Sequence, residues 1–109
     1  MDILYSTRDV EKICADKRGA KKKLGGPGFK KLRARLADIR AAHNVTELIA
    51  GRPHALKGDR VGQFSMNLHG GHRLVFEPAH EPIPEKDDGG IDWNRVTAVC
   101  IIFIGDYHD

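Results

Sequence analysis

The residues that could do chemistry are imidazoles and strong bases on three stretches of the chain. The first runs from His54 to Arg60 and includes Lys57, the second holds Arg73, and the third is Asp106-Tyr107-His108. Histidine titrates near neutrality and transfers protons, while ammonium and guanidinium groups bind phosphoryl oxygens. These residue types suit acid–base chemistry at a phosphate ester, although each stretch alone is a common surface feature.

The chain has the size of one small domain, residues 1–109. It is 40% hydrophobic and 30% charged, which excludes a disordered chain and a membrane protein. Its longest apolar run, Ala98 to Ile104, is far shorter than the roughly 20 residues of a membrane-spanning helix. The N-terminus has no basic segment followed by an apolar one, so we expect no signal peptide and a cytoplasmic protein with no membrane partner.

Charge divides the chain into two halves of opposite sign. The formal net charge is +3, yet residues 1–63 carry 15 Lys and Arg against 7 Asp and Glu, a net charge of +8. Residues 64–109 carry 3 against 8, a net charge of −5. So basic a half suits a polyanion, and the alternative interpretation is a solvated surface offset by the acidic half.

Neither the cysteines nor the histidines form a pattern typical of a metal site. Cys14 and Cys100 have no metal-ligand spacing, and we expect two free thiols in a reducing compartment. His69 and His72 flank two glycines, but no third ligand accompanies them. We therefore expect no metal ion and no cofactor.

Hydrophobic periodicity predicts two helices in the basic half. The first runs from about Thr7 to Arg18, with Ser6 as its capping residue. Glycines then interrupt the pattern, and Lys21-Lys22-Lys23 lies on the mobile connector that they predict. The second helix runs from about Pro27 to Ala42, because proline is favoured in a first turn and an apolar stripe follows, made of Phe29, Leu32, Leu36 and Ile39.

The period then changes to two, which predicts an antiparallel hairpin with strands 63–68 and 72–76. A two-residue Gly-Gly turn would mix apolar and charged side chains on one face of this hairpin. A three-residue loop with a left-handed glycine keeps the apolar side chains together. That register puts Arg73 on the other face, with Asn67 and Ser65.

Two further strands and an acidic stretch complete the chain. Residues 3–5 form a short strand, and 96–104 is so uniformly apolar that we expect a central strand covered on both faces. The stretch 77–95 is an acidic excursion, predicted to be a long loop or a loosely paired one, with Trp93 as its anchor to the core. The predicted fold class is α+β: a small, mainly antiparallel twisted sheet packed against an N-terminal helical pair.

Four motifs, taken in order, resemble the HigB-type killer toxins of the RelE/ParE superfamily of bacterial toxin–antitoxin systems. The motifs are Leu56-Lys57-Gly58-Asp59-Arg60, Gly62-Gln63-Phe64-Ser65, His72-Arg73-Leu74-Val75-Phe76 and Asp106-Tyr107-His108. The resemblance implies a RelE-like fold and a ribosome-dependent endoribonuclease that cuts mRNA in the ribosomal A site without a metal. It also implies a cognate antitoxin, expected to be a small helix-turn-helix protein, as a partner beside the ribosome and mRNA.

Carried over by motif, the catalytic positions of the family fall on His54, Lys57, Arg73, Asp106 and His108. We expect Arg73 to bind phosphoryl oxygens in bidentate fashion and Lys57 to add positive charge. His108 is the expected general acid or base, with Asp106 or His54 orienting it or sharing its work. The candidate RNA-binding residues are Lys21, Lys22, Lys23, Lys30, Lys31, Arg33, Arg60 and Tyr107.

Several alternatives stay open on the sequence alone. The lysines and arginines of the second helix could be its solvated side, and Tyr107 could stack on a base or pack against the sheet edge. A ParE-like inhibitor of DNA gyrase shares the fold but has no need of the set His54, Lys57 and His108. An inactive module that binds an antitoxin or RNA is the third reading. The excursion 77–95 is longer than the turn usual in the family.

Overall fold

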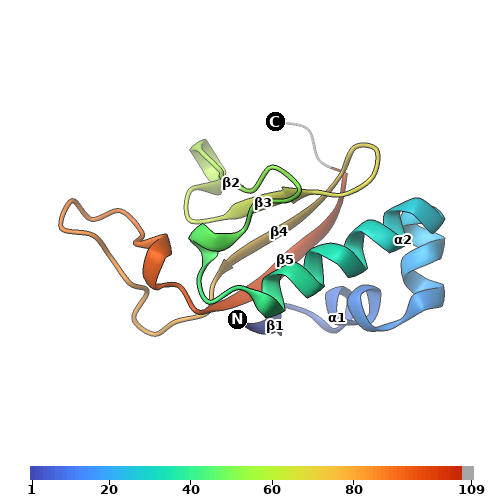
Figure 1. Ribbon diagram of the computed structural model, residues 1–109, viewed down its shortest axis with the longest axis horizontal. Helices are drawn as coiled ribbons and strands as arrows, with labels where there is room; N and C mark the ends of the chain where they lie inside the picture. The colour runs from blue at the N-terminus through green and yellow to red at the C-terminus, as the bar shows by residue number, and fades with distance from the viewer. Residues whose placement is uncertain (107–109) are drawn as a thin grey trace.

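Two helices cover one face of a five-stranded sheet (Figure 1). The computed structural model describes residues 1–106 of the chain. The strands lie in the order β1-β5-β4-β3-β2, and β1 runs parallel to β5 while the other neighbours are antiparallel. The strands are β1 Asp2–Tyr5, β2 His54–Ala55, β3 Phe64–Asn67, β4 His72–Pro78 and β5 Ala98–Asp106.

The first helix, α1, is shorter than predicted and spans Arg8–Ala15. Its N-cap is Thr7, whose hydroxyl accepts a hydrogen bond from the Val10 amide at 3.1 Å, so the expectation for Ser6 was wrong. The predicted end at Arg18 was also wrong. Asp16 is extended there and starts the next helix, because its carboxylate accepts from the Arg18 amide at 3.1 Å.

The second helix, α2, spans Lys17–Ala41 and contains the stretch predicted to be a connector. Lys21-Lys22-Lys23 is helical because Asp16 caps the segment and its apolar members, Ala20 and Leu24, are buried. A break occurs at Gly25, whose φ of 79° ends the first segment and lets Pro27 sit in the first turn of the second. The apolar stripe from this second segment packs on the sheet through Leu32, Leu36 and Ile39.

The β3–β4 hairpin has the predicted register. Met66 pairs with Leu74, Phe64 pairs with Phe76, and the Leu68 amide donates to the His72 carbonyl at 3.0 Å, which leaves three residues in the loop. A φ of 65° at Gly70 confirms the left-handed glycine. The apolar partners of the hairpin face the helices, so the sheet and α2 share one core.

Strand β5 is central, but only one of its faces is covered by helices. Val99, Ile101 and Ile104 are buried in the core, whereas Ile102 and Phe103 are half-buried. The expectation of cover on both faces was therefore wrong. A register shift against β4 leaves Ile102 as an extra residue, and this β-bulge breaks the alternation of side chains along the strand.

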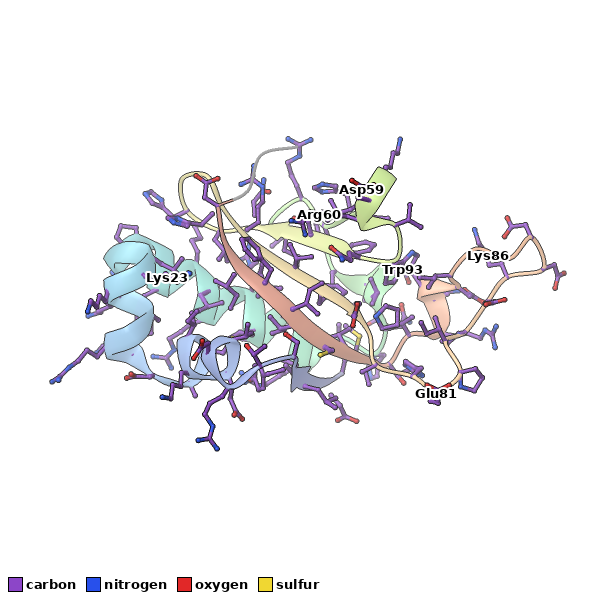
Figure 2. The ribbon with its side chains drawn as sticks, turned by 180° about the vertical axis from the view of Figure 1, so that it is seen from behind. Lys23, Asp59, Arg60, Glu81, Lys86 and Trp93 are labelled. Carbon is purple, nitrogen blue, oxygen red and sulfur yellow. The ribbon has the colours of Figure 1, made fainter. Side chains whose placement is uncertain are left out.

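The acidic excursion is a paired ribbon anchored to the body of the protein. A bridge joins Glu85 to Ile91, and Trp93 packs edge to face against Phe64 with ring centroids 4.8 Å apart, as predicted. Near its base, Nε2 of His80 accepts hydrogen bonds from two consecutive backbone amides of residues 97 and 98. Figures 1 and 2 show the ribbon projecting from the end of the molecule opposite the β3–β4 loop.

The predicted fold class, α+β with a mainly antiparallel sheet against a helical pair, is confirmed. None of the helices described is long and apolar enough to cross a membrane.

Candidate active site

The face of the sheet that carries no helix holds Arg73. The register places Asn67 opposite Arg73 and Arg73 opposite Gly105, so these positions form a row across β3, β4 and β5. Leu74, the next residue of β4, is buried beneath the helices, and successive side chains of a strand point to opposite faces. Arg73 therefore points away from the helices, as the sequence predicted.

A second row lies beside the first and begins with His54. His54 pairs with Ser65, Ser65 with Val75 and Val75 with Phe103. Ser65 and Val75 are fully buried, although they lie on the face without helices. The two rows bring the side chains of His54, Arg73 and Phe103 onto one surface, which we call the open face. The buried residues between them close the floor of this surface.

Arg73 is held by its strand and by its own backbone. It lies in β4, between β3 and β5, and its Nη1 donates to the carbonyl of His72 at 3.2 Å. The side chain is half-buried, so part of the guanidinium meets solvent. A guanidinium on a central strand is a preorganised site for a phosphate, because its fork of N–H groups matches two oxygens at once.

The ring of His54 has a defined tautomer. Its Nδ1 lies 2.7 Å from the carbonyl oxygen of Arg52, and because a carbonyl oxygen only accepts, Nδ1 carries the hydrogen. In the neutral ring Nε2 then holds the lone pair. The side chain is exposed. This contact leaves Nε2 as the ring nitrogen that can accept a proton.

A tight turn places His54 at the edge of the sheet. Gly51 and Arg52 both have positive φ values, 82° and 49°, and the carbonyl of Gly51 accepts from the Asn67 amide at 2.6 Å. A left-handed conformation is unfavourable for a residue other than glycine, and such strain is retained where the surrounding structure enforces it. The turn fixes the start of β2 against the end of β3.

The loop between β2 and β3 carries Lys57 and Arg60. The Leu56 amide donates to the Gln63 carbonyl at 2.9 Å and closes the neck of this loop. Lys57 precedes the short helical turn Gly58–Arg60 and is exposed. Arg60 extends over the open face, with its guanidinium 5.8 Å from the centre of the Phe103 ring (Figure 2).

The remaining predicted catalytic residues belong to the C-terminus. Asp106 pairs with His72, and its carboxylate lies at the tip of the hairpin, where a Cβ placed on Gly71 would be 3.2 Å from both of its oxygens. Position 106 thus lies one step beyond the Arg73 row, and by the alternation of β5 it belongs with Ile104 to the helix side of the sheet. Tyr107 and His108 fall outside the described residues, so their roles stay predictions.

The basic residues of α2 are divided between the border of the open face and the helical layer. All six of the predicted RNA-binding side chains on this helix are exposed, namely Lys21, Lys22, Lys23, Lys30, Lys31 and Arg33. Lys23 approaches the open face, since a Cβ placed on Gly105 would lie 3.7 Å from its Cε. Arg33 instead lies in the helical layer, 5.7 Å from the centre of the Phe29 ring.

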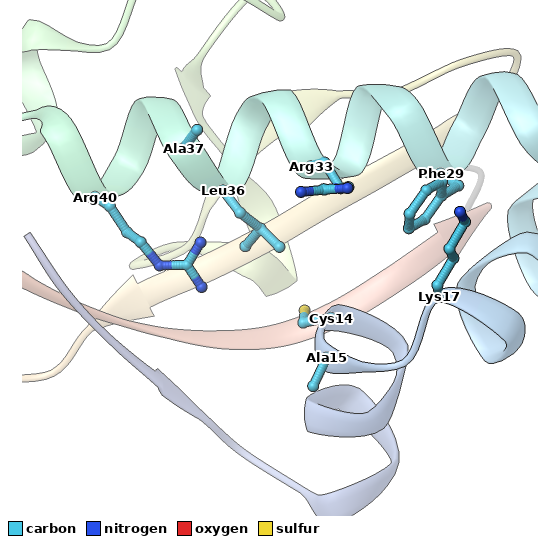
Figure 3. A pocket seen from close by; sticks show the side chains of 8 residues that line it. All are labelled: Cys14, Ala15, Lys17, Phe29, Arg33, Leu36, Ala37 and Arg40. Carbon is cyan, nitrogen blue, oxygen red and sulfur yellow. The ribbon is translucent and has the colours of Figure 1, made fainter.

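A cleft of about 380 Å³ separates α1 from α2 (Figure 3). Lys17, Arg33 and Arg40 supply its cations, Phe29 closes one end, and Cys14 lies on its α1 side. Burial raises the pKa of the Cys14 thiol to about 12, although Arg40 partly opposes the shift. The thiol is therefore protonated near neutrality and is a poor nucleophile.

His69 and His72, the two histidines that flank the glycines of the hairpin, are in contact with each other. Nδ1 of His72 lies 3.2 Å from the carbonyl oxygen of His69. Across residues 1–106, no group of three or more His, Cys, Asp and Glu side chains is arranged to hold a metal ion.

Phe103 is the residue of the open face that the sequence did not predict. Its segment is uniformly apolar, and a regular alternation from Val99 and Ile101 would have buried Phe103 in the core. The β-bulge at Ile102 reverses that alternation. No local feature of the sequence signals the bulge.

Comparisons with known proteins locate the fold. No family model matches the chain, and no curated protein matches its sequence. Among solved structures, a YoeB/ParE toxin from Agrobacterium tumefaciens is similar with a TM-score of 0.61 and 13% identity, over 99% of this chain and 100% of that one.

Two structures from Staphylococcus aureus are also similar. One is a YoeB dimer, with a TM-score of 0.56 and 22% identity, and the other is a YoeB–YefM complex, with 0.58 and 21%. Each match covers 100% of this chain and 98% of the other. The chain therefore has the fold of the solved YoeB/ParE toxins.

Proposed function

We propose that this protein is the toxin of a type II toxin–antitoxin system, of the HigB type, and that it cleaves mRNA in the A site of the ribosome in the cytoplasm. The observation that carries the proposal is the placement of Arg73 and His54 on the open face. They lie two strands apart and one row apart, which corresponds to about 12 Å between their Cα atoms. Both side chains are long enough to reach one phosphodiester group between them.

The proposed reaction is an in-line transesterification. The ribose 2′-oxygen attacks the adjacent phosphorus, the bond from phosphorus to the 5′-oxygen breaks, and the products are a 2′,3′-cyclic phosphate and a 5′-hydroxyl. A base accepts the proton of the 2′-hydroxyl, and an acid donates one to the departing 5′-oxygen. The chain offers side chains for both transfers.

Arg73 is the proposed phosphate ligand. Negative charge increases on the phosphoryl oxygens in the transition state, and a guanidinium fixed on a central strand stabilises it without reorganising. Lys57, on the loop beside this face, adds positive charge. Both residues retain the roles that the sequence predicted for them.

His54 is the proposed base, because its Nδ1 is bonded to the Arg52 carbonyl and Nε2 holds the lone pair. His108 is then the proposed acid, with Asp106 as its orienting group. In this division of roles, removal of either imidazole slows the reaction, because each serves one of the two proton transfers.

An antitoxin is the proposed partner in the resting cell. The solved relative from Staphylococcus aureus is a complex of YoeB with YefM. By analogy, we propose that a cognate antitoxin, a small helix-turn-helix protein, covers the open face and keeps ribosomes from it. The basic side chains of α2, with Arg60 and Tyr107, are proposed to contact ribosomal RNA once the antitoxin is lost.

The test is induction of wild type, Arg73→Ala and His54→Ala in cells, with growth and mRNA 5′ ends measured together. The proposal predicts growth arrest and new mRNA ends for the wild type, with both effects lost in the variants. A supercoiling assay with purified gyrase accompanies it, since one similar structure is described as a YoeB/ParE toxin. Inhibition of gyrase with mRNA left intact would refute the nuclease and favour the ParE-like function.

A further inference from the structure

The bulge at Ile102 turns one aromatic ring out of the core and onto the open face. Phe76 pairs with Ile101 and Val75 pairs with Phe103, so Ile102 has no partner on β4. Beyond this point Ile104, rather than Phe103, continues the buried row. Bulges are common next to active sites, where they redirect a side chain.

Phe103 lies diagonally across the strand pair from Arg73. Arg73 is opposite Gly105, two residues along β5 from Phe103. Such diagonal neighbours are about 7–8 Å apart between Cα atoms, within reach of aromatic and long side chains. A group bound at the Arg73 guanidinium therefore has the ring as its neighbour.

Gly105 sets the position of the ring. A Cβ at this residue would lie 3.0 Å from Cζ of Phe103, which is closer than an ordinary contact, and 3.5 Å from its Cε2. The ring thus occupies the space that a side chain at residue 105 would take. Lys23 borders the same space, with its Cε 3.7 Å from that Cβ position.

Arg60 completes this group from the other side. Its guanidinium lies 5.8 Å from the centre of the Phe103 ring, and its Nη1 donates to Oε1 of Gln63 at 3.1 Å. A half-buried ring bordered by cations suits a nucleotide, since a base stacks on the ring and cations attract the phosphates. An acidic peptide would satisfy the cations but would have no use for the ring.

We propose that Phe103 and Arg60 form a stacking platform for the mRNA base next to the phosphate that Arg73 binds. This inference rests on the proposed function and assigns two residues to substrate recognition within it. Phe103 contacts the base, Arg60 borders the ring and attracts the backbone, and Gly105 is a positioning residue. Stacking tolerates every base, so the platform sets affinity more than sequence preference.

The test is fluorescence of 2-aminopurine in a single-stranded RNA that has a deoxyribose at the reactive position, free in solution and in the ribosomal A site. Wild type is expected to quench the probe. Phe103→Leu keeps an apolar side chain and is expected to lose the quench and raise Kd by about 5- to 150-fold. Phe103→Trp is expected to keep the quench and the wild-type Kd. Gly105→Ala is expected to weaken the quench by displacing the ring.

Tyr5→Leu is the matched control, since it removes a half-buried aromatic residue from β1 at the far edge of the sheet. The salt dependence of RNA binding distinguishes the contribution of Arg60 from that of Phe103. Arg60→Gln is expected to reduce the slope of log K against log salt by about 1, whereas Phe103→Leu leaves the slope unchanged. Urea unfolding of every variant identifies loss of fold.

Each outcome bears on the inference. Equal quench and Kd for wild type and Phe103→Leu would overturn it. It would also be overturned if wild type quenched the probe neither in solution nor in the ribosomal A site. If Phe103→Leu does not fold, Gly105→Ala and Phe103→Trp test the inference instead. Wild-type quench and Kd for Gly105→Ala, together with loss of RNA binding by Phe103→Trp, would overturn it. A wild type that binds and quenches this probe but leaves an mRNA with ribose at every position uncut on the ribosome would refute the proposed function and leave the platform standing.

Discussion

Asn67 lies directly opposite Arg73 across the β3–β4 pair. This pairing depends on the three-residue loop of the hairpin, because a shift of one residue would turn Arg73 toward the core. The turn at Gly51, whose carbonyl accepts from the Asn67 amide at 2.6 Å, holds the same end of β3. The guanidinium therefore takes its position from two turns and a central strand.

Arg73→Lys is predicted to separate charge from geometry. Lysine keeps the positive charge but binds phosphate through a single point, so cleavage should fall by about 100-fold. Stability should change by less than about 0.5 kcal/mol, since the residue is half-buried and its one hydrogen bond is to its neighbour's carbonyl. Single-turnover cleavage and urea unfolding measure the two effects. Arg8→Lys on the exposed start of α1 is the control, and equal loss in both variants would argue against a local role for Arg73.

Alanine substitution at two glycines of α2 is predicted to change the free energy of unfolding in opposite directions. Gly26 has a negative φ and no atom within 4 Å of a Cβ position, so Gly26→Ala should stabilise by about 0.5–1 kcal/mol. At Gly28 the Cβ would lie 2.7 Å from Cβ of Leu24, so Gly28→Ala should destabilise by about 1–3 kcal/mol. Urea midpoints compare the pair. Urea midpoints that shift in the same direction for both variants would contradict the prediction and would show that the two segments of α2 pack differently around Gly25.

Cys14 is predicted to weaken the fold at alkaline pH. Burial raises the pKa of its thiol from about 9 to about 12, so the folded protein resists ionisation that the unfolded chain undergoes freely. The contribution is fully present below pH 9 and is lost as pH rises toward 12. The urea midpoint of wild type should therefore fall relative to Cys14→Ala across this range. A difference that stays constant from pH 8 to 11 would contradict the prediction.

Trp93 is predicted to hold the acidic ribbon to the body. Trp93→Ala removes its contact with Phe64 and should cost about 2 kcal/mol, less than for a fully buried tryptophan because this one is half-buried. Limited proteolysis should then cut near the Glu85–Ile91 bridge sooner than in wild type. Ile83→Ala, at an exposed residue of the same ribbon, provides the comparison and should be cut at the wild-type rate.

The elements whose pattern is local were predictable, and those set by tertiary contacts were not. The hairpin register followed from the alternation around Met66 and the need to keep apolar residues on one face. The helical state of Lys21-Lys22-Lys23 did not follow, because glycines on either side indicate a connector. Its helix depends on the Asp16 cap and on burial of Leu24.

The candidate site shows the same division. Arg73 could be placed on the correct face from the sequence, since its face is fixed by the hairpin. Phe103 could not, because it reaches that face through a bulge within an unbroken apolar run. The tautomer of His54 depends on the left-handed turn at Arg52, which brings a carbonyl to its Nδ1.

The most direct test of the central claim is cleavage of a defined mRNA by the purified protein, with and without ribosomes paused at a known codon, followed by analysis of both new ends. We predict cuts within the A-site codon only when ribosomes are present, with a 2′,3′-cyclic phosphate on one fragment and a 5′-hydroxyl on the other, and no cuts by Arg73→Ala. Intact mRNA in the presence of paused ribosomes, or equal cutting by Arg73→Ala, would contradict it.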